Sequence, residues 1–191
     1  MNIIVVRHGQ TDWNVRDLLQ GRTDIELNET GKSQAIETAN NLKNINIDVI
    51  FVSPLKRTRR TAEEINRIRN LDVTIDERLI ERGFGDYEGQ AGVDFKKYWD
   101  LQANISDNNV EPIKELFERI YSLLNELWEL YGNTDKTILL VTHNGTNLAI
   151  TSILNGLVPN IFEYNLKPCE YRIFENIKRE KGEKFCGKYK I

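Results

Sequence analysis

The chain opens with an apolar run that ends in an arginine and a histidine, IIVVRHG at residues 3–9. Four consecutive β-branched apolar residues are typical of a strand that is buried on both faces of a parallel sheet. Similar apolar runs occur at 47–52 (IDVIFV) and 138–142 (ILLVT). The three runs therefore predict three central strands of one parallel sheet.

Helical patterns lie between and after these strands. Helices are predicted in four segments, at 29–43, at 57–69, after Pro112 and at 146–155. The first has Asn28 as its N-cap and places Ala35, Ala39 and Leu42 on one face. Strands that alternate with helices predict an α/β fold, in which helices cover both faces of a mostly parallel sheet.

The C-terminal part of the sequence predicts a hairpin or an edge pair of strands, at 171–177 (YRIFENI) and 185–191 (FCGKYKI). Cys169 and Cys186 could face each other across this hairpin, but reduced thiols are expected in a cytosolic protein. No repeat and no Pro/Gly-rich linker divides the sequence. Residues 1–191 are therefore predicted to form a single domain.

Composition and charge limit the kind of partner. A length of 191 residues suits one domain, and 40% apolar with 29% charged residues is ordinary for a globular protein. The net charge of -3 argues against a nucleic-acid or membrane binder, because such proteins usually carry a positive surplus. The apolar runs are too short for a membrane span or a signal-peptide core, so a cytoplasmic location is expected.

Charged side chains follow each of the three predicted strands. Arg7 and His8 end the first, Arg57 comes shortly after the second, and His143 follows the third. In open α/β sheets the ligand site lies beyond the carboxyl ends of the strands. The chain has two histidines, and both come directly after a buried strand. We therefore expect these four side chains to meet at one edge of the sheet.

The residue types at this edge favour an anion over a metal ion as the ligand. Zinc or iron sites normally include carboxylate or cysteine ligands, and neighbouring arginines raise the energy of a bound metal ion. Guanidinium groups instead form bidentate, charge-assisted hydrogen bonds with phosphate oxygens. We interpret the cluster as a phosphate pocket without a metal ion or other cofactor.

A phosphate pocket that contains a histidine can transfer a phosphoryl group. A neutral imidazole can attack phosphorus and form phosphohistidine, while arginines and a second, protonated histidine hold the phosphate oxygens. The leaving oxygen needs a proton, and Glu81 in LIERGFGDYEG (79–89) is the candidate donor. Taken alone, this stretch would be interpreted as a solvated loop with ordinary carboxylates. Because Glu81 must be protonated and His8 neutral, the predicted pH profile is bell-shaped.

Five ordered blocks of the sequence resemble signatures of the histidine phosphatase superfamily, the phosphoglycerate mutase-like group. They are RHGQTDWN (7–14), QGRTDIELNETGKSQA (20–35), SPLKRTRRTA (53–62), ERGFGDYEG (81–89) and VTHNG (141–145). The resemblance implies a phosphoglycerate mutase-like three-layer α/β/α fold and a reaction that needs no metal ion.

The resemblance also implies a role for each matching residue. His8 resembles the family's phosphoryl-accepting nucleophile and Glu81 its proton donor, while Arg7, Arg57 and His143 resemble its phosphate-binding groups. Further contacts to the phosphate or the pocket are expected from Asn14, Gln20, Gly21, Thr23 and Asn144.

The chain departs from the common family pattern at three places. Gln10 stands where many members have glutamate, and Asn144 where many have glycine. Asn109-Val110-Glu111-Pro112 stands where many members carry a Gly-Glu-Ser block before the long helix.

Three functions remain open for such a pocket: a phosphatase of small phosphorylated metabolites, a cofactor-dependent phosphoglycerate mutase, and a non-catalytic phosphate-binding module. A mutase must keep its phosphoenzyme from water, and the family's cofactor-dependent mutases carry extra segments that close the pocket. Here only residues 90–111 separate the acid loop from the long helix, which favours the phosphatase. A binding module would be expected to lack His8 or Glu81.

Residues 90–111 are the predicted substrate lid. Phe95, Tyr98 and Trp99 could pack on a nonpolar leaving group, or they could dock the segment onto the core. Lys96 and Lys97 could reach a second anion. The sequence does not indicate an oligomeric state.

Overall fold

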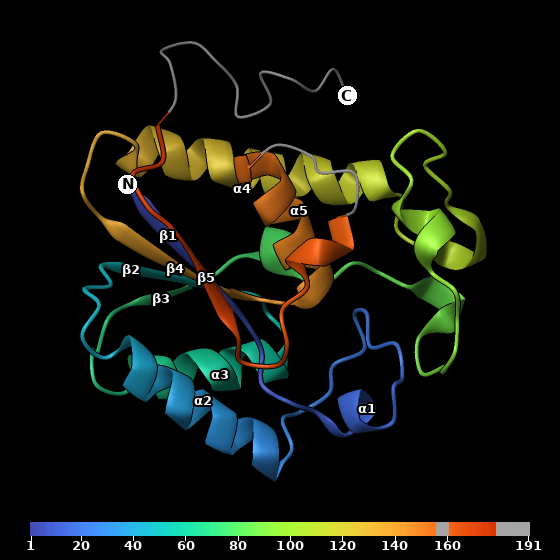
Figure 1. The fold of residues 1–191 in the computed structure, drawn as a ribbon, viewed down its shortest axis with the longest axis horizontal. Helices are drawn as coiled ribbons and strands as arrows, with labels where there is room; N and C mark the ends of the chain where they lie inside the picture. The colour runs from blue at the N-terminus through green and yellow to red at the C-terminus, as the bar shows by residue number, and fades with distance from the viewer. Residues whose placement is uncertain (156–160, 179–191) are drawn as a thin grey trace.

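A five-stranded sheet forms the centre of the fold (Figure 1). The computed structural model describes residues 1–155 and 161–178. The strands are β1 (Asn2–Arg7), β2 (Val49–Val52), β3 (Val73–Ile75), β4 (Thr137–Thr142) and β5 (Tyr171–Phe174). Their order is β3-β2-β4-β1-β5, in which β5 runs antiparallel to β1 and all other pairs are parallel. The predicted mostly parallel sheet is confirmed.

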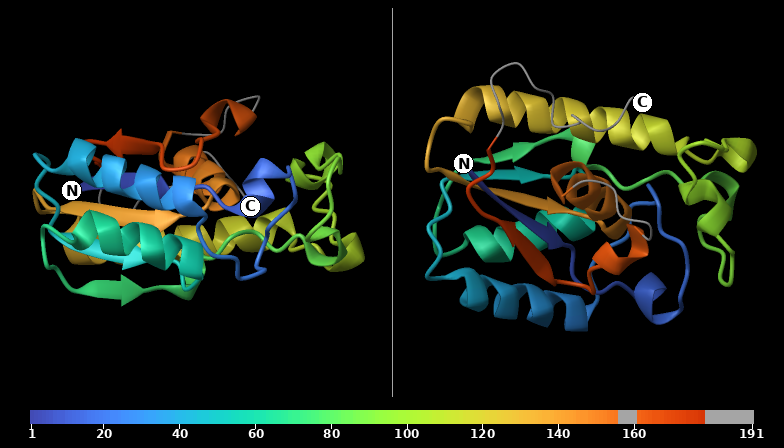
Figure 2. Two further views of the ribbon diagram at one scale, coloured as in Figure 1. Left: turned by 90° about the horizontal axis from the view of Figure 1, so that it is seen from below. Right: turned by 45° about the horizontal axis from the view of Figure 1, so that its top comes forward.

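Helices cover both faces of the sheet, as predicted (Figures 1 and 2). They are α1 (Asp12–Val15), α2 (Glu29–Leu42), α3 (Lys56–Asn66), α4 (Ile113–Tyr131) and α5 (Asn144–Asn155). Alternate residues of β1 point to opposite faces, because side chains alternate along a strand. Ile3 and Val5 join the core under α4 and α5, whereas Ile4 and Val6 join the core under α2 and α3.

The helix ends follow local side-chain chemistry. Asn28 caps α2, since its Oδ1 accepts a hydrogen bond from the Gly31 N–H at 2.9 Å. Helix α3 ends at Asn66, three residues earlier than predicted, because the Asn66 side chain turns to bond both the N–H and the carbonyl of Leu71. Helix α5 begins at Asn144, two residues earlier than predicted.

Several short elements were not predicted. Besides α1 and β3, the structure has the 3-10 helices η1 (Glu77–Leu79), η2 (Gly85–Tyr87), η3 (Lys96–Trp99), η4 (Asp107–Asn109) and η5 (Ile161–Tyr164). Strand β3 lies exposed at the sheet edge, and its three residues are too few for their alternation to stand out in the sequence. None of the helices in the described part of the chain is long and apolar enough to span a membrane.

The predicted C-terminal pair is found only in its first half. Strand β5 pairs with β1, and residues 185–191 lie outside the described residues. Cys169 is a free, buried cysteine, and burial raises the pKa of its thiol to about 12. Cys186 also lies outside the described residues.

Candidate active site

The carboxyl ends of β1, β2 and β4 bring the two histidines together. The His8 N–H donates to the Thr142 carbonyl at 2.9 Å, so the end of β1 lies directly beside the end of β4. The rings of His8 and His143 lie with their centroids 5.2 Å apart. Both side chains are buried.

The turn after β1 lies against the start of α2. A Cβ on Gly9 would stand 2.5 Å from the Gly31 carbonyl oxygen, and one on Gly31 would stand 2.1 Å from the Gln10 carbonyl oxygen. Both positions therefore require glycine. In this turn the Gly9 carbonyl lies 2.7 Å from His8 Nδ1. A carbonyl only accepts, so Nδ1 carries the proton and Nε2 keeps its lone pair.

Two guanidinium groups, those of the half-buried Arg7 and the buried Arg57, lie beside the histidines. Arg7 donates to the Leu166 carbonyl at 2.5 Å, and Arg57 donates to the Gly21 and Thr23 carbonyls at 2.7 and 2.8 Å. Burial lowers the pKa of Arg7 and lowers that of Arg57 to about 10, and the nearby Glu81 opposes both shifts. Within the described residues neither guanidinium forms an ion pair.

Both imidazoles are neutral in the free protein. Burial, reinforced by the positive charge of Arg57, lowers the pKa of His8 and His143 well below 6.5. His143 Nε2 lies 2.7 Å from the Ser53 hydroxyl. The sequence predicts a second, protonated histidine, whereas burial favours the neutral form of His143 in the free protein.

Glu81 is held by the main chain at the start of α5. Its two carboxylate oxygens accept hydrogen bonds from the N–H groups of Gly145 and Thr146, both at 3.1 Å. The Arg82 N–H donates to the same carboxylate at 2.8 Å. Helix N-termini favour such negatively charged groups, because their first N–H groups have no partner within the helix.

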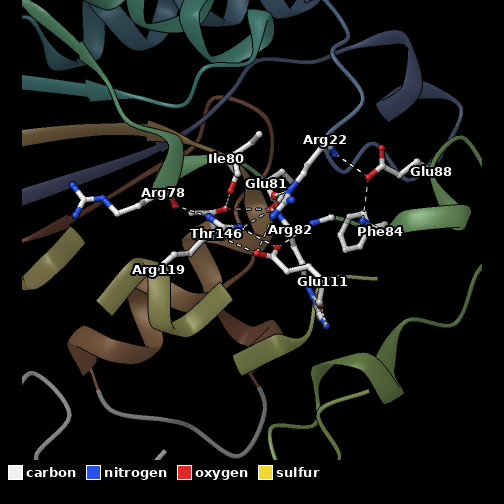
Figure 3. Close-up of polar contacts among 11 residues, drawn as sticks. Arg22, Arg78, Ile80, Glu81, Arg82, Phe84, Glu88, Glu111, Arg119 and Thr146 are labelled. Carbon is white, nitrogen blue, oxygen red and sulfur yellow. Dashed lines mark hydrogen bonds and ion pairs between the residues drawn. The ribbon is translucent and has the colours of Figure 1, made fainter. Parts of the chain in front are cut away.

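A second buried carboxylate, Glu111, connects the segments around Glu81 (Figure 3). Its side chain is 5% exposed and accepts hydrogen bonds from the Arg119 guanidinium at 2.9 and 3.2 Å and from the Gly83 N–H at 3.1 Å. Arg22 pairs with it at 3.0 Å. The Glu111 carbonyl accepts from the buried Arg82 guanidinium at 2.9 and 3.0 Å. Glu111 thus ties α4, the acid loop and the loop before α2 together.

A pocket of about 470 Å³ opens at this edge of the sheet. Eight of the predicted site residues line it: Arg7, His8, Asn14, Gln20, Gly21, Arg57, Glu81 and Asn144. His143 is not among the lining residues, and its ring lies edge-on to that of His8, which does line the pocket. Thr23 is also outside the wall, because its N–H and hydroxyl bind Glu88.

Buried polar atoms without a hydrogen-bond partner gather around this pocket. Of seven such side-chain atoms in the described parts of the chain, four belong to the predicted site: Arg7 Nε, Gln20 Oε1, Arg57 Nε and His143 Nδ1. Buried polar groups are rarely left unpaired, so this concentration indicates a polar ligand. No group of three or more metal-ligating side chains was found among residues 1–155 and 161–178.

The segment 90–111 supplies part of the wall, and its aromatic side chains have different surroundings. Phe95 and Trp99 line the pocket, whereas Tyr98 is buried below it. Lys96 and Lys97 are exposed and lie outside the pocket wall. The segment begins beside the loop before α2, since the Leu19 N–H donates to the Gln90 carbonyl at 3.0 Å.

Sequence reasoning missed several residues of this site. Ser53 directly follows the second predicted strand, and its hydroxyl contacts His143. This position at a strand end could have identified Ser53 as a candidate site residue. The pocket is also lined by Asp17 in a loop, Leu148 on α5, Phe162 on η5 and Asn165 directly after η5. No periodic pattern marks these positions in the sequence.

Fold and site together define an α/β protein with a phosphate-type pocket built on two histidines and two arginines. Residues 3–184 match the histidine phosphatase superfamily (branch 1). The chain is 39% identical over 160 residues to "Uncharacterized phosphatase PhoE" of Bacillus subtilis (strain 168), covering 83% of this chain and 80% of the relative. The chain belongs to the histidine phosphatase superfamily, as the sequence predicted.

Two further similarities carry more specific names. Phosphoserine phosphatase 1 of Hydrogenobacter thermophilus is 31% identical over 165 residues, covering 82% of this chain and 77% of the relative. The solved structure of mycobacterial glucosyl-3-phosphoglycerate phosphatase with VO3 superposes with a TM-score of 0.78 at 28% identity, covering 90% of this chain and 91% of that chain.

Proposed function

We propose that this protein is a phosphomonoesterase that hydrolyses small phosphate esters through a phosphohistidine at His8. One observation carries the proposal. A buried, neutral imidazole with an available Nε2 lies beside two guanidinium groups that have no anionic partner among the described residues. The names of the relatives support a phosphatase, and two of them are named for esters of carboxylated alcohols.

The first half of the reaction transfers the phosphoryl group to the enzyme. His8 Nε2 attacks phosphorus, the bond between phosphorus and the ester oxygen breaks, and Glu81 gives a proton to the leaving oxygen. The Nε groups of Arg7 and Arg57 donate to the phosphate oxygens and offset the developing charge. The Ser53 hydroxyl donates to His143 Nε2, which leaves a protonated Nδ1 to donate to the phosphate.

The second half returns the enzyme to its starting state. Water attacks the phosphohistidine and passes a proton to the Glu81 carboxylate, and the bond between phosphorus and nitrogen breaks to release phosphate. His8 regains its lone pair. The hydrogen bond from Nδ1 to the Gly9 carbonyl keeps the ring in one orientation through both halves.

Three further parts of the proposal rest on the sequence and the site chemistry. The arginine pair supplies the positive charge that a metal ion gives to other phosphatases, so the reaction is metal-independent. The segment 90–111 acts as a short lid that admits water, which supports hydrolysis over the mutase reaction. The protein acts on a free metabolite in the cytoplasm, without a nucleic-acid or membrane partner.

The test is hydrolysis of a panel of phosphomonoesters in the presence of a chelator, comparing the native chain with His8→Ala. Samples quenched during turnover are examined for an acid-labile, base-stable phosphoenzyme. Metal-independent turnover and label that both vanish in His8→Ala, with an unchanged circular dichroism spectrum, are the expected result. Labelling by bisphosphoglycerate without ester hydrolysis would point to a mutase, and absence of both turnover and label would point to a binding module.

A further inference from the structure

The pocket has two chemically different ends. Arg7, His8 and Arg57 form the phosphate end. The opposite end is largely apolar and aromatic, and its main lining side chains are Phe84, Phe95, Trp99, Leu148 and Phe162. In a phosphomonoesterase this second end receives the leaving group, because the phosphate end receives the phosphoryl group.

The aromatic side chains at this end support one another. The Phe84 and Phe95 rings lie 4.8 Å apart between centroids, and the Trp99 and Phe162 rings 5.8 Å apart. The buried Arg82 guanidinium lies 4.9 Å from the centre of the Trp99 ring and is held in turn by the Glu111 carbonyl. A preformed apolar surface of this kind binds an apolar group with little ordering cost.

Among the described residues, Asp17 is the one charged side chain that lines the pocket besides Arg7, Arg57 and Glu81. Arg7 and Arg57 are the only lysines or arginines that line the pocket within the described residues, and both belong to the phosphate end. Asp17 also lines the pocket and is exposed. Lys97, which sequence reasoning offered for a second anion, lies over the Tyr98 ring and 3.6 Å from Asp107. A second anionic group on a substrate would therefore meet no lysine or arginine in the described pocket wall besides Arg7 and Arg57.

We propose that this pocket selects phosphomonoesters whose leaving group is aromatic or aliphatic and carries no carboxylate or second phosphate. The inference rests on the proposed hydrolysis, since it assigns the apolar end of the same pocket to the leaving group. An apolar ring of the leaving group is removed from water when it packs against Phe95 and Trp99, which favours binding. A carboxylate would lose hydration there without gaining a partner. This preference differs from the carboxylated esters for which two of the relatives are named.

The test compares substrates that differ in charge but share one kind of leaving oxygen. Benzyl phosphate and 4-carboxybenzyl phosphate are matched in this way, and 3-phosphoglycerate and phosphoserine extend the set of carboxylated esters. We expect kcat/KM for benzyl phosphate to exceed that for each carboxylated ester at least tenfold. Equal or higher kcat/KM for any carboxylated ester would overturn the proposal.

Two kinds of variant connect the preference to named residues. Asp17→Asn removes the negative charge, and asparagine accepts the positive φ of 53° at this position. It should reduce the ratio of kcat/KM for benzyl phosphate to kcat/KM for 4-carboxybenzyl phosphate several-fold. Asp94→Asn, at an exposed position outside the pocket wall, should leave this ratio unchanged. Trp99→Ala and Phe95→Ala should each lower kcat/KM for benzyl phosphate about tenfold, with a smaller effect on ethyl phosphate.

A binding measurement separates failure of this inference from failure of the proposed function. Benzylphosphonate and 4-carboxybenzylphosphonate carry no ester bond to hydrolyse, so their dissociation constants from calorimetry report the pocket alone. Tighter binding of benzylphosphonate supports the preference even if no ester is turned over. Equal or tighter binding of the carboxylated phosphonate refutes the preference whether or not the protein is a phosphatase.

Discussion

Substitution of Glu111 is expected to impair both stability and proton donation, because this buried carboxylate holds the acid loop in place. Glu111→Ala leaves Nε and Nη2 of Arg119 and the Gly83 N–H without their acceptor, while Arg119 Nη1 keeps its hydrogen bond to the Arg78 carbonyl. The side chains of Glu111 and Arg119 are 5% and 16% exposed. That of Arg22 is 48% exposed, so water can replace its lost partner.

The size of the stability loss follows from these exposures. Breaking a fully buried pair costs about 3–5 kcal/mol, and an unpaired buried N–H costs about 1–3 kcal/mol. Partial access of water to Arg119 reduces the sum, so we expect a loss of about 3 kcal/mol for Glu111→Ala. For a domain of this size that corresponds to a fall of roughly 6–12 °C in Tm. Glu111→Gln keeps an acceptor oxygen and should lose about half as much.

The catalytic effect should depend on the leaving group. Gly83 follows Glu81 by two residues, so a displaced Gly83 main chain disturbs the carboxyl that donates the proton. Alkyl esters need that proton, whereas esters with an acidic leaving group such as 4-nitrophenol need it much less. We expect Glu111→Gln to lower kcat at least tenfold for benzyl phosphate and only two- to threefold for 4-nitrophenyl phosphate, with KM nearly constant.

The assay is steady-state kinetics on both esters together with thermal unfolding. Glu64→Gln is the matched control, because Glu64 is also a buried glutamate that pairs with two arginines, Arg60 and Arg67, but lies on α3 outside the pocket wall. The control should lose stability without a leaving-group effect. If Glu111→Gln slows both esters equally, Glu111 has only a structural role and the reasoning is refuted.

Three further outcomes are expected. Ser53→Ala removes the hydroxyl that contacts His143 at 2.7 Å and should lower kcat/KM about fivefold, since one hydrogen bond contributes about 1 kcal/mol; an unchanged kcat/KM would exclude a role for Ser53. Both buried histidines have a pKa well below 6.5, so only the unfolded chain takes up protons at these two residues as the pH falls below 6.5. The free energy of unfolding, measured with urea, should therefore drop by about 2 kcal/mol between pH 6.5 and 5.5. In His143→Gln this drop should be about half as large. Gly31→Ala places a methyl group 2.1 Å from the Gln10 carbonyl oxygen and should lower stability by more than 2 kcal/mol in a thermal melt, although alanine is the better helix former.

The central strands and the long helices could be predicted from the sequence, because burial on both faces or on one face leaves a periodic apolar pattern. All six residues of β4 are buried, and the corresponding run was recognised from its composition alone. Strand β3 was missed for the opposite reason: its three residues are exposed at the sheet edge. A short exposed strand is held by its backbone hydrogen bonds to β2, which no side-chain pattern records.

The phosphate end of the site could also be predicted, because the sheet itself fixes it. Arg7 and His8 end β1, and His143 follows β4, so parallel pairing of the two strands brings the histidines together. The position of Thr23 could not be predicted in the same way. It lies in a loop whose path is set by Glu88, a residue distant in the sequence, and its side chain faces that carboxylate instead of the pocket.

The two ends of the pocket therefore differ in what a substitution can change. The phosphate end stands on strand ends and on the first turn of α3, all of which belong to the core, so altering Arg57 or His8 disturbs packing and chemistry together. The opposite end is formed largely by side chains on 3-10 helices and loops, such as Phe95 and Phe162, which contribute little to the two main cores. Replacing these rings alters the surface offered to the leaving group at small cost in stability. A change of substrate preference thus requires no change in the phosphoryl-transfer chemistry, which accounts for one fold carrying phosphatases named for different esters.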